Sequence, residues 1–382
     1  MTAPAVPDAP GAPGLSGEGP TATSGPVHVI GSGLLGASLG MALTRRGVEV
    51  TLEDISPLNV GVAADLGAGR ARAQGDPEPA LVVVAVPPDM AGGVVVRALR
   101  DYPGAVVTDV ASVKSAVLQD VHDAGADLTR YVGSHPMAGR ERSGPAAALP
   151  DLFEGRPWVI VDSGASAETA LLRVRDVAVD VGAQVFHMDA ASHDKAVALV
   201  SHVPQVVSSL MAGVLAEADD RALALAGGGL RDVTRIAASD PALWAVILLG
   251  NAGPVAGLLR GVRDGLDQAL AALDQAAAGS LGEPMAALHR LIAAGNEGVA
   301  RIPGKHGGAH VDWDEVTVMV PDEPGALGRL FTLIGDIGLN LEDVNIEHAG
   351  GKPVGLTTIY VAKGAGAEAA AALAGAGWRI LA

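Results

Sequence analysis

The chain has no cysteine among its 382 residues, and only 3% of them are aromatic. Without cysteine there can be no disulfide and no thiol chemistry, so a reducing cytoplasm is the expected location. The shortage of aromatic residues leaves most of the packing to Ala, Val, Leu and Gly. Because 49% of the residues are hydrophobic, the chain can still bury a sizeable core, and its length suffices for two or three domains.

Positive charge is also scarce, with 26 Lys and Arg against 43 Asp and Glu and a net charge of −17. This balance argues against a nucleic-acid partner, which requires a basic surface. It also means that a site for an anionic substrate must supply its own local positive charge. No apolar run reaches the length of a membrane span without Gly, Pro or a charge, so no membrane partner is expected. No metal is expected either.

The first half of the chain reads as a tail followed by an α/β domain. Residues 1–25 are rich in Pro, Gly, Ala and Ser, lack the basic start and apolar core of a signal peptide, and are predicted to be disordered. Residues 26–188 alternate β-branched runs with helical patterns, which is typical of a doubly wound parallel sheet of the Rossmann type. Its strands are expected within 27–43 and at 48–54, 81–88, 105–114, 131–139 and 157–164.

In the second half of the chain the spacing of the apolar residues changes twice. Residues 189–300 carry apolar residues at spacings of three and four, which predicts an all-helical domain whose large apolar faces favour a homodimer. Residues 301–312 have the composition of a linker. Residues 313–382 follow the order βαββαβ, which predicts a ferredoxin-like domain.

A glycine turn comes directly after the first predicted strand. Gly31, Gly33 and Gly36 form G-x-G-x-x-G at the start of a helix, where they permit the turn, the approach of a pyrophosphate and close packing of helix on strand. The helix N-terminus adds N–H groups that favour an anion. The cofactor-binding residues are therefore expected to be Gly31, Ser32, Gly33, Leu34, Leu35, Gly36, Asp54, Val86 and Pro87.

The acid at the end of the second strand indicates which cofactor binds. Asp54 lies 23 residues after Gly31, close to the spacing for a carboxylate on the ribose 2′-hydroxyl. It fits the alternation of the strand better than Glu53, which stays the alternative. Because Ile55 and Ser56 follow rather than arginine, the sequence favours NAD over NADP.

The segment GSHPMAGRERSG (133–144) places a histidine at the end of a predicted strand. The carboxyl ends of the strands are where an α/β sheet of this kind binds its ligands. Imidazole titrates near neutral pH, so His135 can take a hydroxyl proton while hydride leaves the same carbon. The alternative is a turn histidine that only bonds to a backbone carbonyl.

Four segments occur in a fixed order, namely TDVASVKSAV, GSHPMAGRERSG with DLFEGRPWVI, SHDKAVALVSHVPQ, and RDVTRIAASDPALW. Together they resemble the prephenate/arogenate dehydrogenase family of tyrosine biosynthesis, over residues 27–300. The C-terminal segments PDEPGALGRLF and GLNLEDVNIEH look like an ACT domain, a small module that senses amino acids. The resemblance implies NAD-dependent oxidative decarboxylation of a cyclohexadienol, with prephenate as the expected substrate.

The same resemblance implies roles for individual residues. It assigns the catalytic histidine to His135 and its hydrogen-bonding partner to Ser112. It assigns the grip on the ring carboxylate to Arg235, whose guanidinium can bind bidentately, and the orientation of that arginine to Asp232, which can also form a simple helix pair with it. Other expected substrate-binding positions are Glu141, Arg140, Ser201, Gln205 and Asp194.

Two departures from the family pattern bear on the choice of substrate. Arg140 replaces a threonine found in many members, and Gln205 replaces a histidine found in some. Arg140 either meets the substrate's side-chain carboxylate or is a solvated charge at the rim. Both residues favour prephenate, whereas Glu141 favours the ammonium group of arogenate, which stays the alternative substrate. His202 is expected to be structural and His193 to lie on the surface.

The ACT-like segment implies an effector. L-Tyrosine is expected at the turn and helix start formed by Asp322, Gly325, Ala326 and Leu327, with Asn340 as a further candidate. Glycine at position 325 would let the backbone approach the ligand. The alternative is a module that only assists dimerisation.

Two other classes of protein are weighed against this one. A β-hydroxyacid dehydrogenase combines the same two kinds of domain but uses a lysine of the helical half, and here no lysine occurs between Ala196 and Gly304. Lys195 lies at the very start of that domain. A non-catalytic sensor would be expected to lose His135 or Arg235, and both are present.

Overall fold

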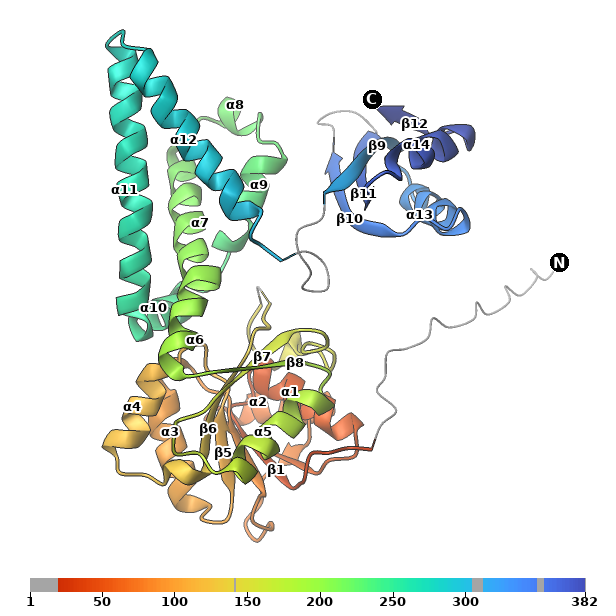
Figure 1. Ribbon diagram of the computed structural model, residues 1–382. Helices are drawn as coiled ribbons and strands as arrows, with labels where there is room; N and C mark the ends of the chain where they lie inside the picture. The colour runs from red at the N-terminus through yellow and green to blue at the C-terminus, as the bar shows by residue number, and fades with distance from the viewer. Residues whose placement is uncertain (1–19, 141, 304–311, 349–353, 382) are drawn as a thin grey trace, which may run out of the picture. The chain divides into compact units, whose positions relative to one another are not determined.

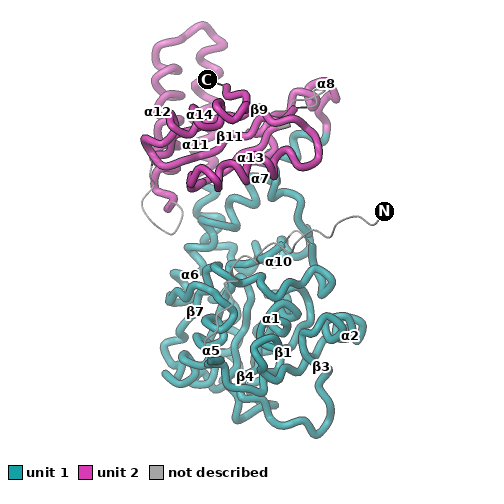
Figure 2. The backbone as a smooth tube through the Cα atoms, turned by 90° about the vertical axis from the view of Figure 1, so that its right-hand side faces the viewer, with its two compact units in different colours: residues 1–216, 234–260 teal, residues 217–233, 261–382 magenta. Residues whose placement is uncertain are grey.

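The computed structural model describes residues 20–140, 142–303, 312–348 and 354–381. Glu141, one of the expected substrate-binding residues, lies outside the described residues. The chain divides into two compact units, the first ending at residue 216 but also holding 234–260, and the second holding 217–233 and 261 onward (Figure 2). The predicted boundaries at residues 188, 300 and 312 stay predictions.

The first unit is built on an eight-stranded sheet of order β3-β2-β1-β4-β5-β6-β7-β8. The part from β3 to β6 has the strand order of a Rossmann fold, in which ligands bind beyond the carboxyl ends where the order reverses, here between β1 and β4. The strands are β1 (Val27–Ile30), β2 (Val50–Glu53), β3 (Arg70–Ala71), β4 (Leu81–Val84), β5 (Val106–Asp109), β6 (Tyr131–Pro136), β7 (Pro157–Val161) and β8 (Gln184–Met188).

One pair of strands departs from the predicted parallel sheet. β7 runs antiparallel to β6, whereas every other neighbouring pair in this sheet is parallel. A parallel return needs a crossover, usually a helix, and in the described part of the connection from β6 to β7 the one helical element is the short 3-10 turn η2 (Pro145–Ala147). The sequence analysis also missed β3 and β8, because β3 has two exposed residues and β8 is mostly exposed without alternation.

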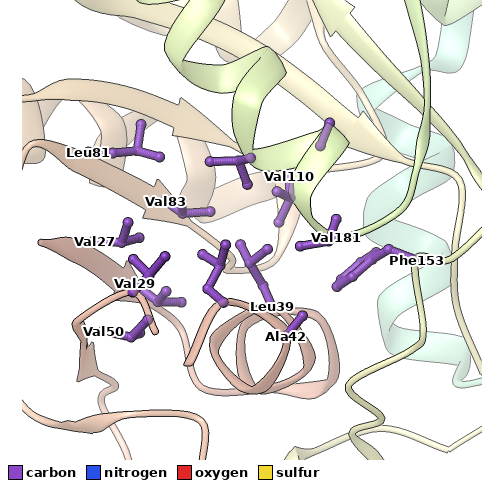
Figure 3. Close-up of a cluster of buried hydrophobic side chains, with 14 of the residues drawn as sticks. Val27, Val29, Leu39, Ala42, Val50, Leu81, Val83, Val110, Phe153 and Val181 are labelled. Carbon is purple, nitrogen blue, oxygen red and sulfur yellow. The ribbon is translucent and has the colours of Figure 1, made fainter. Parts of the chain in front are cut away.

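Helices cover both faces of this sheet (Figure 1). Two of them, α3 (Pro88–Asp101) and α4 (Ser115–Asp123), pack on one face, and α1 (Leu34–Arg45), α2 (Pro57–Asp65) and α5 (Glu168–Asp180) pack on the other. Figure 3 shows the second layer, with Val27 and Val29 of β1 directed toward Leu39 of α1. Burial on both faces explains why β4 is a continuous apolar run rather than an alternating one, and why all four residues of β1, His28 included, are buried.

The predicted helical region is confirmed, because no strand occurs in the described residues 190–303. Its first helices run without a break as α6 (Ala190–Val197), a π-helical turn η3 (Ala198–His202) and α7 (Val203–Val214). The first unit also holds the 3-10 turn η5 (Arg235–Ala237) and α10 (Pro241–Gly250). The remaining helices are α8 (Asp220–Leu223), α9 (Gly228–Thr234), α11 (Ala252–Ala277) and α12 (Gly282–Val299).

The helix Ala190–Glu217 is long and apolar enough to cross a membrane by length and composition, as is the bent pair Gly228–Ala237 and Pro241–Gly250 taken jointly. Only 33% of the most apolar window of the first helix is buried. Near its start, however, the helix carries Asp194, which is buried and accepts a hydrogen bond from the backbone N–H of Lys114. A helix whose apolar face packs against protein has the same length and composition.

The C-terminal domain has the predicted order of elements. It consists of β9 (Trp313–Pro321), α13 (Ala326–Asp336), β10 (Leu341–His348), β11 (Val354–Ala362), α14 (Gly366–Gly375) and β12 (Arg379–Leu381). The sheet order is β10-β11-β9-β12 with antiparallel neighbours, so the ferredoxin-like prediction is confirmed. Alternate residues of β9 face the helices, where Val318 packs in one core with Leu330 and Leu373.

Candidate active site

The three glycines of the turn after β1 are required for different reasons. Gly31 has φ +102°, and a Cβ placed on it would lie 2.3 Å from the carbonyl oxygen of Ala85. A Cβ on Gly36 would lie 1.9 Å from the carbonyl oxygen of Gly31. A Cβ on Gly33, by contrast, would meet no protein atom within 4 Å. The protein's own packing therefore excludes a side chain at two positions, while at Gly33 it leaves open space beside the N-terminus of α1.

An acid lies at the same turn. The backbone N–H of Ser32 donates to one carboxylate oxygen of Asp54 at 2.7 Å, and Ser56 N–H donates to the other at 2.8 Å. Glu53, the alternative in the sequence, instead pairs with Arg97 at 3.1 Å and contacts the buried His28. Asp54 is therefore the carboxylate at the glycine turn.

Two further features of the turn fit a dinucleotide. The Ser32 hydroxyl is buried and has no hydrogen-bond partner among the described residues, so it is available to a ligand oxygen. Val86, which follows β4, lies against Gly31, and Pro87 caps α3 on the same side of the strand order reversal. Leu34 and Leu35 form the first turn of α1, whose free N–H groups favour a phosphate. The residues present therefore fit NAD.

His135 lies at the end of β6, where it pairs in register with Val159 of β7. Its side chain is buried, and its Nδ1 lies 2.9 Å from Nε2 of His193. No hydrogen bond from the described residues occupies its other nitrogen, Nε2. Burial, followed by the neighbouring charges of His193, Lys114 and His202, holds the pKa of His135 well below its ordinary value. The imidazole is therefore neutral near pH 7 and able to accept a proton.

The prediction that His193 lies on the surface is wrong. It is fully buried on α6, between His135 and Asp194, and its Nδ1 lies 2.9 Å from a carboxylate oxygen of Asp194. The sequence around it, SHDK, is polar throughout, so nothing in the local pattern distinguishes a buried from an exposed position. Only the packing of α6 on the end of the sheet buries this face of the helix.

Asp194 has no free oxygen among its described neighbours. One oxygen accepts hydrogen bonds from His193 and from the backbone N–H of Lys114 at 2.9 Å, and the other accepts from Ser115 N–H at 2.8 Å. The carboxylate therefore binds the chain where α4 begins. Ser112 is half-buried three residues before that start, in the segment that follows β5.

The sequence analysis assigned no role to Lys114, yet its side chain is fully buried beside the site. Its ammonium forms an ion pair with Asp109 of β5 and donates to the carbonyl oxygen of Ser134 at 2.7 Å. The Tyr131 hydroxyl donates to the second oxygen of Asp109 at 2.7 Å. Burial lowers the pKa of Lys114, and the charges of Asp109 and Asp194 oppose that shift. Lys114 follows β5 in the mixed segment TDVASVK, so the sequence around it did not indicate a buried lysine.

A second cluster lies where the π-helical turn joins α7, at the position of Ser201. His202 is buried, and its Nδ1 accepts a hydrogen bond from the side-chain amide of Asn251 at 3.0 Å. The same amide donates to the carbonyl oxygen of Asp194 at 2.7 Å, a link that the sequence did not reveal. Gln205 is also buried and bonds to Ser209 and Ser239, so its amide is already engaged within the fold.

The two arginines expected at the substrate have fewer partners than the buried residues of the site. Arg235 is exposed at the start of η5, which contacts α7, and within the described part of the first unit no carboxylate pairs with it. Asp232 belongs to the second unit, so its pairing with Arg235 stays a prediction. Arg140 donates to the carbonyl oxygen of Ala147 at 2.9 Å, which ties it to the connection between β6 and β7.

A dinucleotide turn at one strand end and a buried, neutral histidine at another define a nicotinamide-nucleotide-dependent dehydrogenase. Comparison with known proteins makes this specific. Residues 39–187 match the nucleotide-binding domain of prephenate dehydrogenase, and residues 189–287 match the dimerization domain of the same enzyme. The chain belongs to the prephenate dehydrogenase family, and the resemblance found in the sequence is confirmed.

Individual proteins similar to this chain belong to the same family. The probable prephenate dehydrogenase NovF of Streptomyces niveus is 36% identical over 338 residues, covering 87% of this chain and 93% of that protein. Prephenate dehydrogenase from A. aeolicus, solved with hydroxyphenyl propionate and NAD+, has a TM-score of 0.61 and 28% identity, covering 71% of this chain and 97% of that one. Synechocystis arogenate dehydrogenase has a TM-score of 0.59 and 26% identity, covering 72% and 98%.

Proposed function

We propose that this chain catalyses the NAD-dependent oxidative decarboxylation of prephenate to 4-hydroxyphenylpyruvate. The observation that carries the proposal is the state of His135, which is buried, neutral and bonded at Nδ1 while Nε2 is unoccupied by the described residues. Such a nitrogen suits the removal of a hydroxyl proton from a buried substrate. The names of the relatives point to the same reaction.

The reaction balances with this single acid/base group. Bound NAD+ supplies the hydride acceptor for the carbon that bears the substrate hydroxyl. His135 Nε2 takes the hydroxyl proton, and the O–H electron pair becomes part of a carbonyl bond. The ring carboxylate then leaves as CO2, its bonding electrons make the ring aromatic, and the oxygen takes its proton back from His135. Ser112, in the segment after β5, is assigned the second hydrogen bond to that hydroxyl.

The substrate has two carboxylates in a protein of net charge −17, so local positive charge decides its binding. Arg235 is assigned to the ring carboxylate, because within its unit it has no carboxylate partner among the described residues. Arg140 is assigned to the side-chain carboxylate. Prephenate is favoured over arogenate because Gln205 is neutral and already bonded to Ser209 and Ser239, which leaves no acid there for an ammonium group.

The experiment is an assay of NADH formation with prephenate, arogenate and a simple 3-hydroxyacid. We expect turnover with prephenate, slower turnover with arogenate and none with the hydroxyacid. His135→Asn should reduce kcat far more than it changes KM, whereas Arg235→Gln should mainly raise KM. Full turnover by His135→Asn would contradict the assignment of the base.

We also propose that the ferredoxin-like domain is an ACT domain that binds L-tyrosine, the end product of the pathway. Support comes from a groove of about 490 Å³ lined by Met319, Pro321, Arg329, Val354, Ala376, Gly377, Trp378 and Arg379. The guanidinium of Arg379 suits a carboxylate, whereas that of Arg329 already pairs with Glu323, and Trp378 offers a surface for an aromatic ring. The groove adjoins the expected turn of Asp322 to Leu327, where Gly325 has φ +84°. Asn340 instead bonds to Glu342.

This proposal is tested by activity with and without L-tyrosine. We expect inhibition of the full chain and its loss in Arg379→Ala, because that arginine is exposed and distant from the dehydrogenase residues in sequence. Lys363→Ala, which removes a charge elsewhere in the same domain, is the matched control and should keep the inhibition. An identical response to tyrosine in both variants would contradict a role for the groove.

A further inference from the structure

Three buried side chains form one continuous hydrogen-bonded chain at the end of the sheet. His135 Nδ1 lies 2.9 Å from His193 Nε2, and His193 Nδ1 lies 2.9 Å from Asp194 Oδ1. His193 is fully buried and Asp194 is 3% exposed, so water does not compete for either bond. The two histidine rings meet edge to face, with centroids 5.1 Å apart. The chain runs from the proposed base into the protein interior.

The Asp194 carboxylate decides which nitrogen of His193 and of His135 carries the proton. Asp194 accepts backbone N–H groups from Lys114 and Ser115, so it is held as a carboxylate that only accepts. His193 must therefore donate from Nδ1, which leaves its Nε2 as an acceptor. His135 must then donate from Nδ1, which leaves its own Nε2 with a free electron pair. Each neutral imidazole has one donor and one acceptor, so no other arrangement satisfies both bonds.

Among the groups around His135, the charge of Asp194 favours its protonation, whereas burial and the charges of His193, Lys114 and His202 oppose it. Lys114 is itself paired with Asp109, to which the Tyr131 hydroxyl also donates. No Lys or Arg pairs with Asp194 among the described residues of this cluster, where its side-chain partner is His193. The Asp194 carboxylate is therefore the negative charge of the cluster that has no Lys or Arg partner. A proton that reaches His135 neutralises the cluster instead of creating an isolated buried cation.

We propose that His193 and Asp194 are positioning residues, which hold His135 in the tautomer with a basic Nε2 and balance the charge that His135 gains from the substrate. This inference rests on the proposed dehydrogenase function for its catalytic meaning. Neither residue touches the substrate. The assignment changes the role expected for Asp194, which acts through His193 and not on the substrate.

The first test needs no substrate. Nitrogen-15 NMR of the histidine side chains in the wild-type protein, assigned with His135→Asn and His193→Gln, should show both rings protonated at Nδ1. Protonation of His135 at Nε2 would overturn the inference. If the tautomers are as expected but neither prephenate nor arogenate is turned over, the proposed function fails while the positioning assignment stands.

The second test reverses the donor and acceptor directions of the hydrogen bonds that link His135, His193 and Asp194. In Asp194→Asn an amide NH2 placed at the oxygen that faces His193 would donate to His193 Nδ1 and reverse both tautomers. The remaining oxygen would keep the bond from Ser115 N–H, while Lys114 N–H would lose its acceptor. We expect a loss of roughly 10³- to 10⁴-fold in kcat, the scale seen when a catalytic histidine takes the wrong tautomer. KM and the dissociation constant for NAD should change by less than about threefold. Unchanged kcat in a folded variant would overturn the inference.

The third test separates positioning from packing. His193→Phe fills the site but removes the acceptor, whereas the side-chain oxygen of His193→Gln can accept from His135 Nδ1. We expect the Gln variant to recover at least about tenfold in kcat over the Phe variant, a step of the size of one hydrogen bond. Equal activity of the two variants would indicate that His193 only fills space and would overturn the inference.

The pH profile adds an independent reading. The other ionisable groups that face the chain are Lys114 and Asp109 at the end of β5, Tyr131 of β6 and His202 of the π-helical turn. Removing the charge of Asp194 leaves His135 among neighbours that disfavour its protonation. The acidic limb of kcat should therefore move to lower pH in Asp194→Asn. A limb that stays in place would contradict the charge-balancing role.

Discussion

The backbone N–H of Ser32 donates to the carboxylate of Asp54 at 2.7 Å, which joins the glycine turn after β1 to the end of β2. This bond places the carboxylate where the ribose of a bound dinucleotide is expected. We predict that Asp54→Asn raises the KM for NAD roughly tenfold, because it weakens a hydrogen bond to a charged acceptor. Glu53→Gln is the matched control, and an equal effect of both variants in steady-state kinetics would contradict the assignment.

Substitution of the three glycines should separate folding from cofactor binding. Gly31→Ala and Gly36→Ala place a methyl group 2.3 Å and 1.9 Å from carbonyl oxygens, so both should lower the thermal unfolding temperature. Gly33→Ala meets no protein atom and should keep the wild-type unfolding temperature without cofactor. It should nevertheless lose the stabilisation that NAD gives the wild type. Full stabilisation of Gly33→Ala by NAD would show that the dinucleotide lies elsewhere.

The buried ion pair of Lys114 and Asp109 should be costly to break from one side. Lys114→Met leaves the Asp109 carboxylate buried with the Tyr131 hydroxyl but without a cation. We expect a loss of about 3–5 kcal/mol in the free energy of unfolding, measured with urea. Combining it with Asp109→Asn should restore part of the loss, because no uncompensated charge remains. Independent, additive losses would contradict coupling between the two residues.

Stability should decline in mildly acidic solution because of His202. Burial lowers its pKa from the ordinary 6.5 to about 4. Between these values the unfolded chain binds a proton that the folded chain does not, so stability is complete above pH 6.5 and is lost as the pH falls toward 4. His135, whose pKa is also lowered by burial, acts in the same direction. Urea midpoints across this range should fall less steeply in His202→Gln, and an unchanged slope would contradict the assignment.

One face of α11 is suited to a second copy of the chain. Val262, Leu266, Leu270 and Leu273 recur at helical spacing and are 46–58% exposed within this single chain. The match to a dimerization domain covers this stretch. We predict that Leu266→Glu with Leu270→Glu shifts a homodimer toward monomer in light scattering. Leu58→Glu, on a residue of α2 that is 74% exposed, should leave the mass unchanged.

The sequence by itself determined the class of fold in each region and the glycine turn after the first strand, because both depend on local patterns. Glycine spacing, β-branched runs and helical periodicity are read within a few residues of each other. The order of the C-terminal elements was likewise predicted throughout. The antiparallel pairing of β7 was missed, because the direction of a strand depends on the connection that precedes it and not on the strand's own residues.

Only the tertiary structure decided how His135, the proposed catalytic base, is supported. His135 was identified from its motif, but its partner His193 lies 58 residues further along the chain in a polar segment that resembles a surface helix. Lys114 and Asn251 were missed for the same reason, since each is an ordinary polar residue until the fold surrounds it. Burial removes water as an alternative partner, so the fold forces these groups to bond to each other.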